Sequence, residues 1–160
     1  MPKFDTEGPS LPPELILGVP VIDGEHDRLF FIHSLLSDCQ SGSSDTDVIK
    51  TAALLLRDYA SQHLTHEEMM LRANHYPELD EHIRQHEELR RDLAKMAGGV
   101  QTGTTSLDQL KTFVWNWLSL HIGQSDRAYA EYFAGRELEI PPMSIEAMLS
   151  ACGDDDESLM

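Results

Sequence analysis

Residues 63–86 read HLTHEEMMLRANHYPELDEHIRQH. This stretch holds two pairs of candidate metal-binding side chains, each spaced by four residues: His63 with Glu67, and His82 with His86. Side chains four residues apart stack on one face of a helix, about 6 Å apart along its axis. Between the pairs, the run at residues 74–77, Asn-His-Tyr-Pro, interrupts the helical pattern. The stretch therefore predicts two consecutive helices, each presenting a pair of polar groups on one face.

Start and stop signals divide the rest of the chain into two further helices. We expect Asp23 to be the N-cap of the first helix, and the second helix to follow the loop at residues 41–47. Pro77 suits the first position of the third helix, and Ser106 opens the fourth through a capping box with Gln109. The expected ends of the four helices are Cys39, Ala73, Ala97 (before Gly98-Gly99) and Phe133.

The apolar residues recur every three or four positions, as in Leu110, Val114, Trp117 and Leu118. No convincing strand alternation competes with this spacing. Four amphipathic helices joined by short loops predict an all-α fold, an up-down-up-down four-helix bundle. The expected parts are an extended N-terminal arm (1–21), the bundle (22–134) and an acidic C-terminal extension (135–160), in which a short helix could form over residues 144–151.

Composition and charge restrict the classes of protein and partner. Of the 160 residues, 41% are hydrophobic and 25% charged, as in an ordinary globular domain. Lys and Arg number 12 and Asp and Glu 28, so the formal net charge is −16, which argues against nucleic acid or an anionic membrane as a partner. We found neither a targeting signal nor an apolar run long enough to span a bilayer, so a cytoplasmic location is expected. The sequence leaves a protein partner unknown.

Three more candidate ligands follow the same core-facing stripes. His26 lies one turn before Leu29, His121 lies four residues after Trp117, and Asp126 follows His121 by five. Five imidazoles and two carboxylates are thus expected in one bundle core, with at least one from every helix. Burying such groups without partners costs a few kcal/mol each, and metal coordination removes that cost. Seven ligands are too many for one tetrahedral zinc and suit two octahedral irons with one position left open.

These residues and their neighbours resemble the hemerythrin family over residues 17–133. The resemblance rests on His26, His63-x3-Glu67, His82-x3-His86 and His121-x4-Asp126. It also rests on the local sequences IDGEHDRL at 22–29, HLTHEEMM at 63–70 and WLSLHI at 117–122. A ferritin-like di-iron protein would instead need Glu-x-x-His pairs, and no histidine of this chain has a glutamate three residues before it.

The resemblance implies a role for each candidate residue. It assigns His82, His86 and His121 to one iron ion, and His26 and His63 to the other. Glu67 and Asp126 would bridge the two iron ions together with an oxo or hydroxo group, and dioxygen would bind reversibly at the open position of the second. Leu29, Trp117 and Ile122 match positions that line the dioxygen pocket and exclude water. The chain departs from many relatives at residues 14–17, where they carry a tryptophan, and after Gly135, where it continues past the usual end of the domain.

The resemblance implies dioxygen storage, delivery or scavenging, and the sequence favours this over an enzyme. The alternatives are a di-iron enzyme of peroxidase, nitric oxide reductase or iron-repair type, or a redox or oxygen sensor. An enzyme would want a proton donor near the open position, and the core face offers no carboxylate beyond Glu67 and Asp126 except the ambiguous Glu68. Among the other histidines, we expect His66 and His75 to face solvent and His33 to be a core or partly exposed residue.

Overall fold

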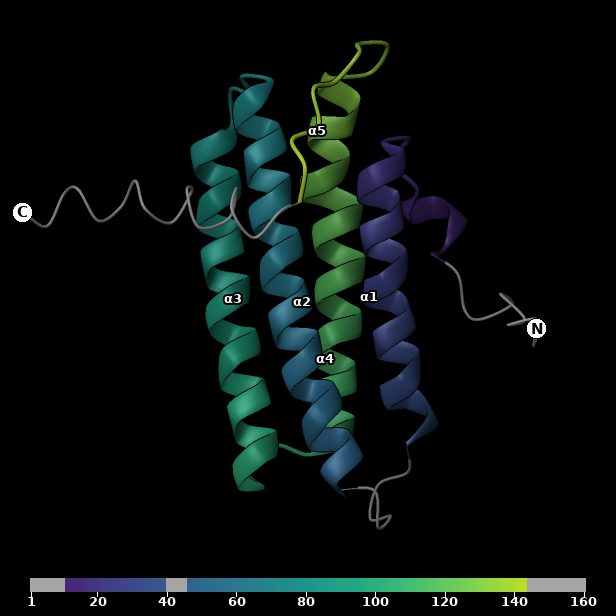
Figure 1. Cartoon of the computed structure of the whole chain (residues 1–160), viewed down its shortest axis with the longest axis vertical. Helices are drawn as coiled ribbons and strands as arrows, with labels where there is room; N and C mark the ends of the chain where they lie inside the picture. The colour runs from purple at the N-terminus through teal and green to yellow at the C-terminus, as the bar shows by residue number, and fades with distance from the viewer. Residues whose placement is uncertain (1–10, 40–45, 144–160) are drawn as a thin grey trace, which may run out of the picture.

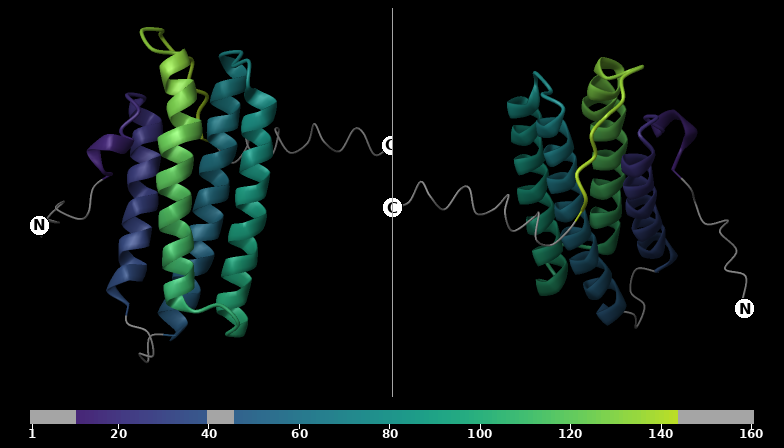
Figure 2. Two further views of the ribbon diagram at one scale, coloured as in Figure 1. Left: turned by 180° about the vertical axis from the view of Figure 1, so that it is seen from behind. Right: turned by 45° about the horizontal axis from the view of Figure 1, so that its top comes forward.

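Four long helices lie side by side and alternate in direction (Figures 1 and 2). This computed structural model describes residues 11–39 and 46–143, and every regular element within those ranges is helical. The fourth long helix runs without a break from α4 through a π-helical turn into α5 (Figure 1), and we call these three elements together the fourth rod. The predicted all-α four-helix bundle is confirmed. Its elements are η1 (Pro13–Leu15), α1 (Pro20–Asp38), α2 (Thr46–Ala73), α3 (Leu79–Thr102), α4 (Leu107–Leu120), η2 (His121–Asp126) and α5 (Arg127–Tyr132).

The first helix begins earlier than its sequence predicts. Pro20, expected to lie in an extended arm, is the first residue of α1, where the missing N–H of proline costs nothing. Asp23 is therefore inside the first turn and is not the N-cap. Its carboxylate instead accepts hydrogen bonds from the N–H groups of Leu17 (2.8 Å) and Gly18 (3.1 Å). Asp23 thus fixes the loop that leads into the helix.

The third helix is displaced at both ends. It begins at Leu79, two residues after Pro77, and it continues through Gly98-Gly99 to Thr102. It ends at Gly103, whose φ of +80° is the left-handed conformation that glycine adopts most readily. A Cβ at Gly99 would overlap the side chain of Thr105, so this glycine is needed for the close approach of the loop and does not end the helix.

The fourth helix begins as predicted. Ser106 Oγ accepts from the N–H of Gln109 (3.1 Å), and the N–H of Ser106 donates to Gln109 Oε1 (2.9 Å). The second helix ends at Ala73 as expected and begins at Thr46, within the predicted loop. Local capping chemistry therefore sets the start of the fourth helix.

Replacing Ser106 with alanine is expected to lower the free energy of unfolding by about 1 kcal/mol, because it removes the side-chain acceptor of the capping box. Urea unfolding of the metal-free protein measures this change. Ser37→Ala is the matched control, because the Ser37 hydroxyl only donates to the carbonyl of His33 within α1. Equal losses in the two variants would contradict a capping role.

The core forms two apolar clusters with the polar centre between them. One cluster includes Leu29, Leu64 and Leu118, and the other includes Ile22, Met70 and Tyr129. Each of α1, α2 and the fourth rod contributes to both clusters, and one predicted ligand on each (His26, Glu67 and Asp126) lies between the two contributions. The core therefore encloses the polar centre from both ends of the bundle.

The chain after α5 returns along α2 (Figure 2). We call residues 137–143 the strap. The Asn74 amide donates to the carbonyl of Glu139 (2.7 Å) and accepts from its N–H (2.9 Å). Leu138 and Ile140 pack against the second apolar cluster. The helix considered over residues 144–151 lies outside the described residues.

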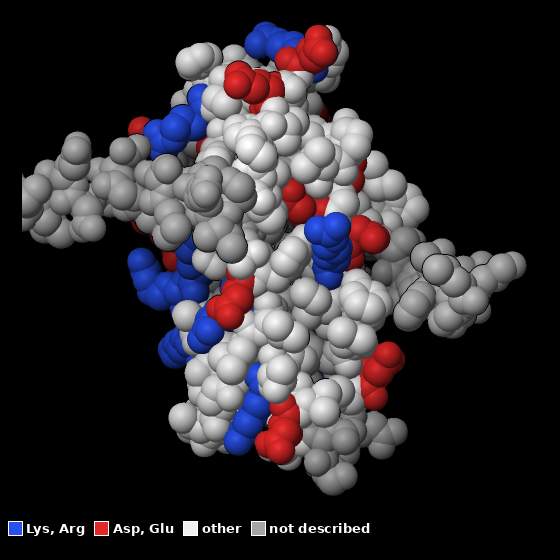
Figure 3. Space-filling model, viewed as in Figure 1, with Lys and Arg blue, Asp and Glu red and all other residues white. Residues whose placement is uncertain are grey.

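The surface of the described residues is mixed in charge. On the face seen in Figure 3, Lys and Arg side chains are separated by acidic and uncharged residues, and no continuous basic surface forms on that face of the described chain. In residues 11–39 and 46–143, no helix combines the length and the apolar character that crossing a membrane requires. The absence of nucleic-acid and membrane partners remains a prediction from the net charge.

Candidate metal centre

The structure brings all seven predicted ligands together in the middle of the bundle. Their ligand atoms form two groups, within each of which all atoms lie within 4.8 Å of one another. All seven side chains are at least nine-tenths buried, and α1, α2, α3 and the fourth rod each contribute. One group is Glu67, His82, His86, His121 and Asp126; the other is His26, His63 and Glu67.

Glu67 is the residue that the two groups share. Its Oε1 lies 2.7 Å from His82 Nε2 and 3.0 Å from His86 Nε2. Its Oε2 lies 3.8 Å from the Nε2 atoms of both His26 and His63. Each carboxylate oxygen therefore faces one group of imidazoles, which is the arrangement of a carboxylate that bridges two ions.

Asp126 and His26 provide a test of whether the donor set fits metal ions. Asp126 Oδ1 lies 3.1 Å from His121 Nε2, and Oδ2 lies 3.2 Å from His26 Nε2. Nevertheless neither oxygen of Asp126 and neither ring nitrogen of His26 has a hydrogen bond of acceptable geometry, although all four atoms are buried. Orphaned buried polar atoms are costly, and here their lone pairs converge. The donor set fits metal ions held among these residues.

A π-helical turn brings His121 and Asp126 onto one face. In a regular α-helix, residues five apart point about 140° away from each other. The turn at His121–Asp126 is π-helical, and this wider turn aligns residues five apart. The π-helical turn therefore explains why two ligands of the centre are five residues apart, which α-helical periodicity did not predict.

In the metal-free protein, the surroundings of the centre strongly shift the pKa values of its side chains. Burial alone would lower the pKa of His82, but the hydrogen bond to Glu67 and the negative charges of Glu67 and Asp126 raise that pKa to about 10. Burial opposes ionisation of Glu67 and Asp126, yet the surrounding imidazoles hold both carboxyl pKa values well below their usual range. Burial lowers the pKa of His63. Metal ions would therefore displace protons from the histidines, above all from His82.

Two residues behind His63 were missed by the sequence analysis. His66, expected to face solvent, is only 2% exposed, and Glu25 is 4% exposed. His63 Nδ1 donates to Glu25 Oε1 (2.8 Å), and His66 Nδ1 donates to Glu25 Oε2 (2.7 Å). Both expectations, a solvent-facing His66 and no further core carboxylate, are wrong. A signal existed for His66, because it lies three residues after His63 and hence on the same helix face.

Two more groups contact the predicted ligands from outside. His86 Nδ1 donates to Glu68 Oε2 (3.2 Å), and Arg90 also donates to this carboxylate. The Tyr129 hydroxyl donates to Glu67 Oε2 (3.0 Å). Such partners hold an imidazole in the tautomer whose other nitrogen is free to bind a metal. Nε2 of His63 and of His86 is accordingly the atom that faces the centre.

The remaining predicted residues surround the centre or lie away from it. Leu29, Trp117 and Ile122 are all buried in the first apolar cluster, and their role in lining a dioxygen pocket remains a prediction. His33 is half-buried and contacts the Lys111 carbonyl, away from both groups. His75 is exposed, as expected.

Comparison with known proteins agrees with this geometry. The sequence model of the family described as "Hemerythrin HHE cation binding domain" matches residues 17–133. The chain belongs to the hemerythrin family. Proteins named bacteriohemerythrin are similar to it: those of Stenotrophomonas maltophilia and Pseudomonas paraeruginosa are 30% and 29% identical over 118 residues, and that of Pseudomonas aeruginosa is 28% identical. Each of these alignments covers 74% of this chain and 76% of the relative.

The hemerythrin match includes some of the features described above and leaves others outside. All seven predicted ligands, together with Glu25 and His66, lie within the matched residues 17–133. The strap, residues 137–143, lies beyond them. The family supports a cation-binding centre in the bundle core. The strap lies outside the match and is joined by hydrogen bonds to His66 and Asn74.

Proposed function

We propose that this protein binds dioxygen reversibly at a di-iron centre. His82, His86 and His121 would hold one iron ion, and His26 and His63 the other, with Glu67 and Asp126 between them. The observation that carries the proposal is the position of Glu67, whose two oxygens face the two groups of imidazoles. Two ferrous ions would supply the two electrons that reversible dioxygen binding requires.

The two groups are unequal, which supports a binding site at one of them. One group contains three histidines and the other two, so an ion held by the second group would have fewer protein ligands and would leave a position for dioxygen. Leu29, which is buried in the first cluster, lies one helical turn after His26 on α1, and Leu64 of the same cluster directly follows His63. They would exclude water and so slow irreversible oxidation.

The structure also bears on the choice between binding and enzymatic turnover. The additional carboxylates, Glu25 and Glu68, contact the Nδ1 atoms of His63 and His86 and therefore lie behind the imidazoles, away from the centre. In the metal-free protein, burial and the neighbouring Glu67 carboxylate raise the pKa of Tyr129 well above its usual value. The additional carboxylates are thus not placed to deliver a proton at the open position, and this favours reversible binding.

An anaerobic optical titration tests the proposal. Purified protein is loaded with ferrous iron, its metal content is counted, air is admitted, and the oxygen is then removed. Two irons per chain and a visible charge-transfer band that forms in air and disappears on deoxygenation are expected. Zinc-loaded protein is the control and should show no band. A band that never forms, or one that decays at once to an unreactive diferric spectrum, would contradict reversible binding and favour the enzyme or sensor alternatives.

A further inference from the structure

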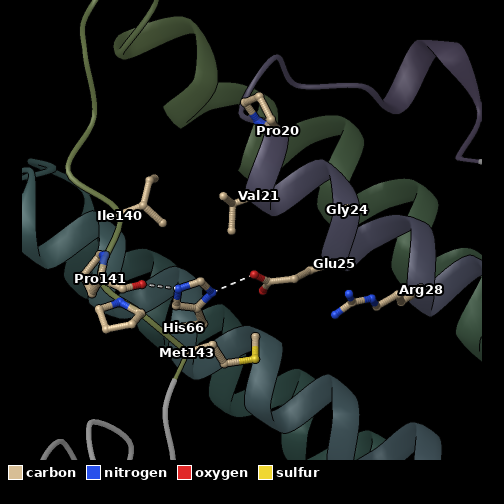
Figure 4. Close-up of a pocket in the computed structure, with 10 residues that line it drawn as sticks. Pro20, Val21, Gly24, Glu25, Arg28, His66, Ile140, Pro141 and Met143 are labelled. Atoms are coloured by element: carbon tan, nitrogen blue, oxygen red, sulfur yellow. Dashed lines mark hydrogen bonds and ion pairs between the residues drawn. The ribbon is translucent and has the colours of Figure 1, made fainter.

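A chain of hydrogen bonds joins the strap to the centre. His66 Nε2 donates to the Pro141 carbonyl (2.6 Å), and His66 Nδ1 donates to Glu25 Oε2 (2.7 Å). Glu25 Oε1 accepts from His63 Nδ1 (2.8 Å). Figure 4 shows Glu25 on α1 facing His66 on α2, with the strap on the other side of the imidazole. A segment 75 residues away in the sequence is thereby connected to a predicted metal ligand.

The direction of each hydrogen bond follows from the partners. The Pro141 carbonyl and the ionised Glu25 carboxylate can only accept, so both ring nitrogens of His66 donate. Glu25 also accepts the proton of His63 Nδ1, which leaves the lone pair of His63 Nε2 on the side of Glu67. The orientation of His63 toward the centre therefore depends on where the Glu25 carboxylate is held.

Hydrogen bonds as well as packing hold Glu25 in place. Glu25 and His66 line a cleft of about 550 Å³ whose walls include Val21, Arg28 and Ile140. Figure 4 shows the two side chains meeting across this cleft. A buried carboxylate needs hydrogen-bond donors, and these donors also select its rotamer. Here they come from His63 on one side and His66 on the other.

We propose that His66, anchored by the Pro141 carbonyl of the strap, is a positioning residue that holds Glu25 against His63 and thereby directs His63 Nε2 at the metal centre. This inference rests on the proposed role of His63 as a metal ligand. It gives the strap, which lies outside the residues matched to the family, a part in building the centre. The group held most directly is the two-histidine one, where the open position is proposed.

Metal release from the full-length protein tests the inference. The variants are His66→Leu, which removes both hydrogen bonds, and Glu25→Gln, which keeps the shape of the side chain. Loss of an outer partner typically weakens a metal site about tenfold or more, so each variant should release one of its two ferrous ions to a chelator about tenfold faster. The other ion should leave at the parental rate. With cobalt(II) bound, the visible ligand-field spectrum should also change.

Asn74→Ala is the matched control. It removes the other tie between α2 and the strap without touching His66 or Glu25. Its ion release and cobalt spectrum should be parental, even where the thermal midpoint of its metal-free form falls. If His66→Leu does not fold, Glu25→Gln and Asn74→Ala still decide the matter.

Two results would overturn the inference. One is release from Glu25→Gln or His66→Leu at the rate of Asn74→Ala, and the other is equal acceleration of both ions. Because the chelator assay needs no dioxygen, it separates this inference from the proposed function. Selective release without a reversible dioxygen band would support the role of His66 and contradict reversible dioxygen binding. Fewer than two ions in the parent protein would contradict both.

Discussion

Glu67→Gln is expected to reduce the metal content from two ions per chain to one or none. Glu67 is the residue common to the two ligand groups, and each of its oxygens faces one of them. A neutral amide cannot offer two anionic oxygens, and its nitrogen is a donor that repels a cation. A ligand contributes more than an outer partner, whose loss costs about 10- to 100-fold, so the affinity for the second ion should fall by more than about a hundredfold.

Glu68→Gln is the matched control for this prediction. Glu68 is the next residue on α2, but its carboxylate contacts only the Nδ1 side of His86 and the Arg90 guanidinium. This variant should keep two ions and lose at most about tenfold in affinity. Anaerobic ferrous titration with elemental analysis measures both variants. Two tightly bound ions in Glu67→Gln would refute a bridging role.

Much of the centre could be predicted because its ligands follow local periodicity. The pairs His63/Glu67 and His82/His86 are spaced by about one helical turn, so a helix alone places each pair on one face. The capping box at Ser106 is also a local device, and it begins α4 as predicted. Features that depend on residues within one turn of each other can be deduced from sequence, and the bundle follows from four such amphipathic segments.

The mispredicted helix ends depend on contacts that periodicity does not report. Asp23 has the residue type of an N-cap, but its carboxylate binds the N–H groups of Leu17 and Gly18 from inside the helix. Gly99 has the residue type of a helix end, but the approach of Thr105 explains it. In both cases the deciding contact is with a residue five or six positions away in the adjoining loop, beyond a single helical turn.

The unpredicted parts of the centre are its outer partners. Glu25 and His66 come together because α1 and α2 pack side by side, and Pro141 reaches His66 from 75 residues away. A helix pattern gives the face on which His66 lies but not the chain segment that covers that face. The π-helical turn at His121–Asp126 was equally hidden, since a sequence with a five-residue spacing does not state which turn accommodates it.

The outer partners and the shifted pKa values both favour positive charge at the centre. In the metal-free protein, protons supply that charge, because the Asp126 and Glu67 carboxylates raise the pKa of His82 to about 10. Metal ions need the same nitrogens deprotonated, so protons and metal compete for His82. The metal-free and metal-loaded proteins should therefore respond to pH in opposite directions.

The metal-free protein is expected to be most stable between about pH 4.5 and 6.5 and to lose stability as the pH rises through 10. The folded pKa of His82 lies above its usual 6.5, so its stabilising contribution is complete below 6.5 and disappears through about 10. The lowered pKa values of Glu67 and Asp126 affect stability at the acidic end of the pH range. Their contribution is present above the usual 4.5 and 3.8 and disappears only as the pH falls through the lower folded values.

Metal loading should reverse the alkaline half of this profile. Ferrous binding strengthens as protons leave the histidines, and a thousandfold excess over the dissociation constant stabilises the fold by about 4 kcal/mol. For a chain of this size that is roughly 10 °C in thermal midpoint. The gap between loaded and metal-free midpoints, measured anaerobically by circular dichroism, should therefore widen from pH 5.5 to pH 9.

His82→Gln tests whether this residue causes the alkaline loss of stability. Its metal-free form should show a smaller decline between pH 6.5 and 10, because the group whose pKa is raised to about 10 is gone. His26, His66 and His86, whose pKa values are also raised, account for the decline that remains. His75→Gln replaces an exposed histidine and should keep the decline. An alkaline decline of parental size in His82→Gln would mean that other groups bind the protons. If the difference between the metal-loaded and metal-free thermal midpoints stays constant with pH, the metal does not compete with protons at the histidine nitrogens.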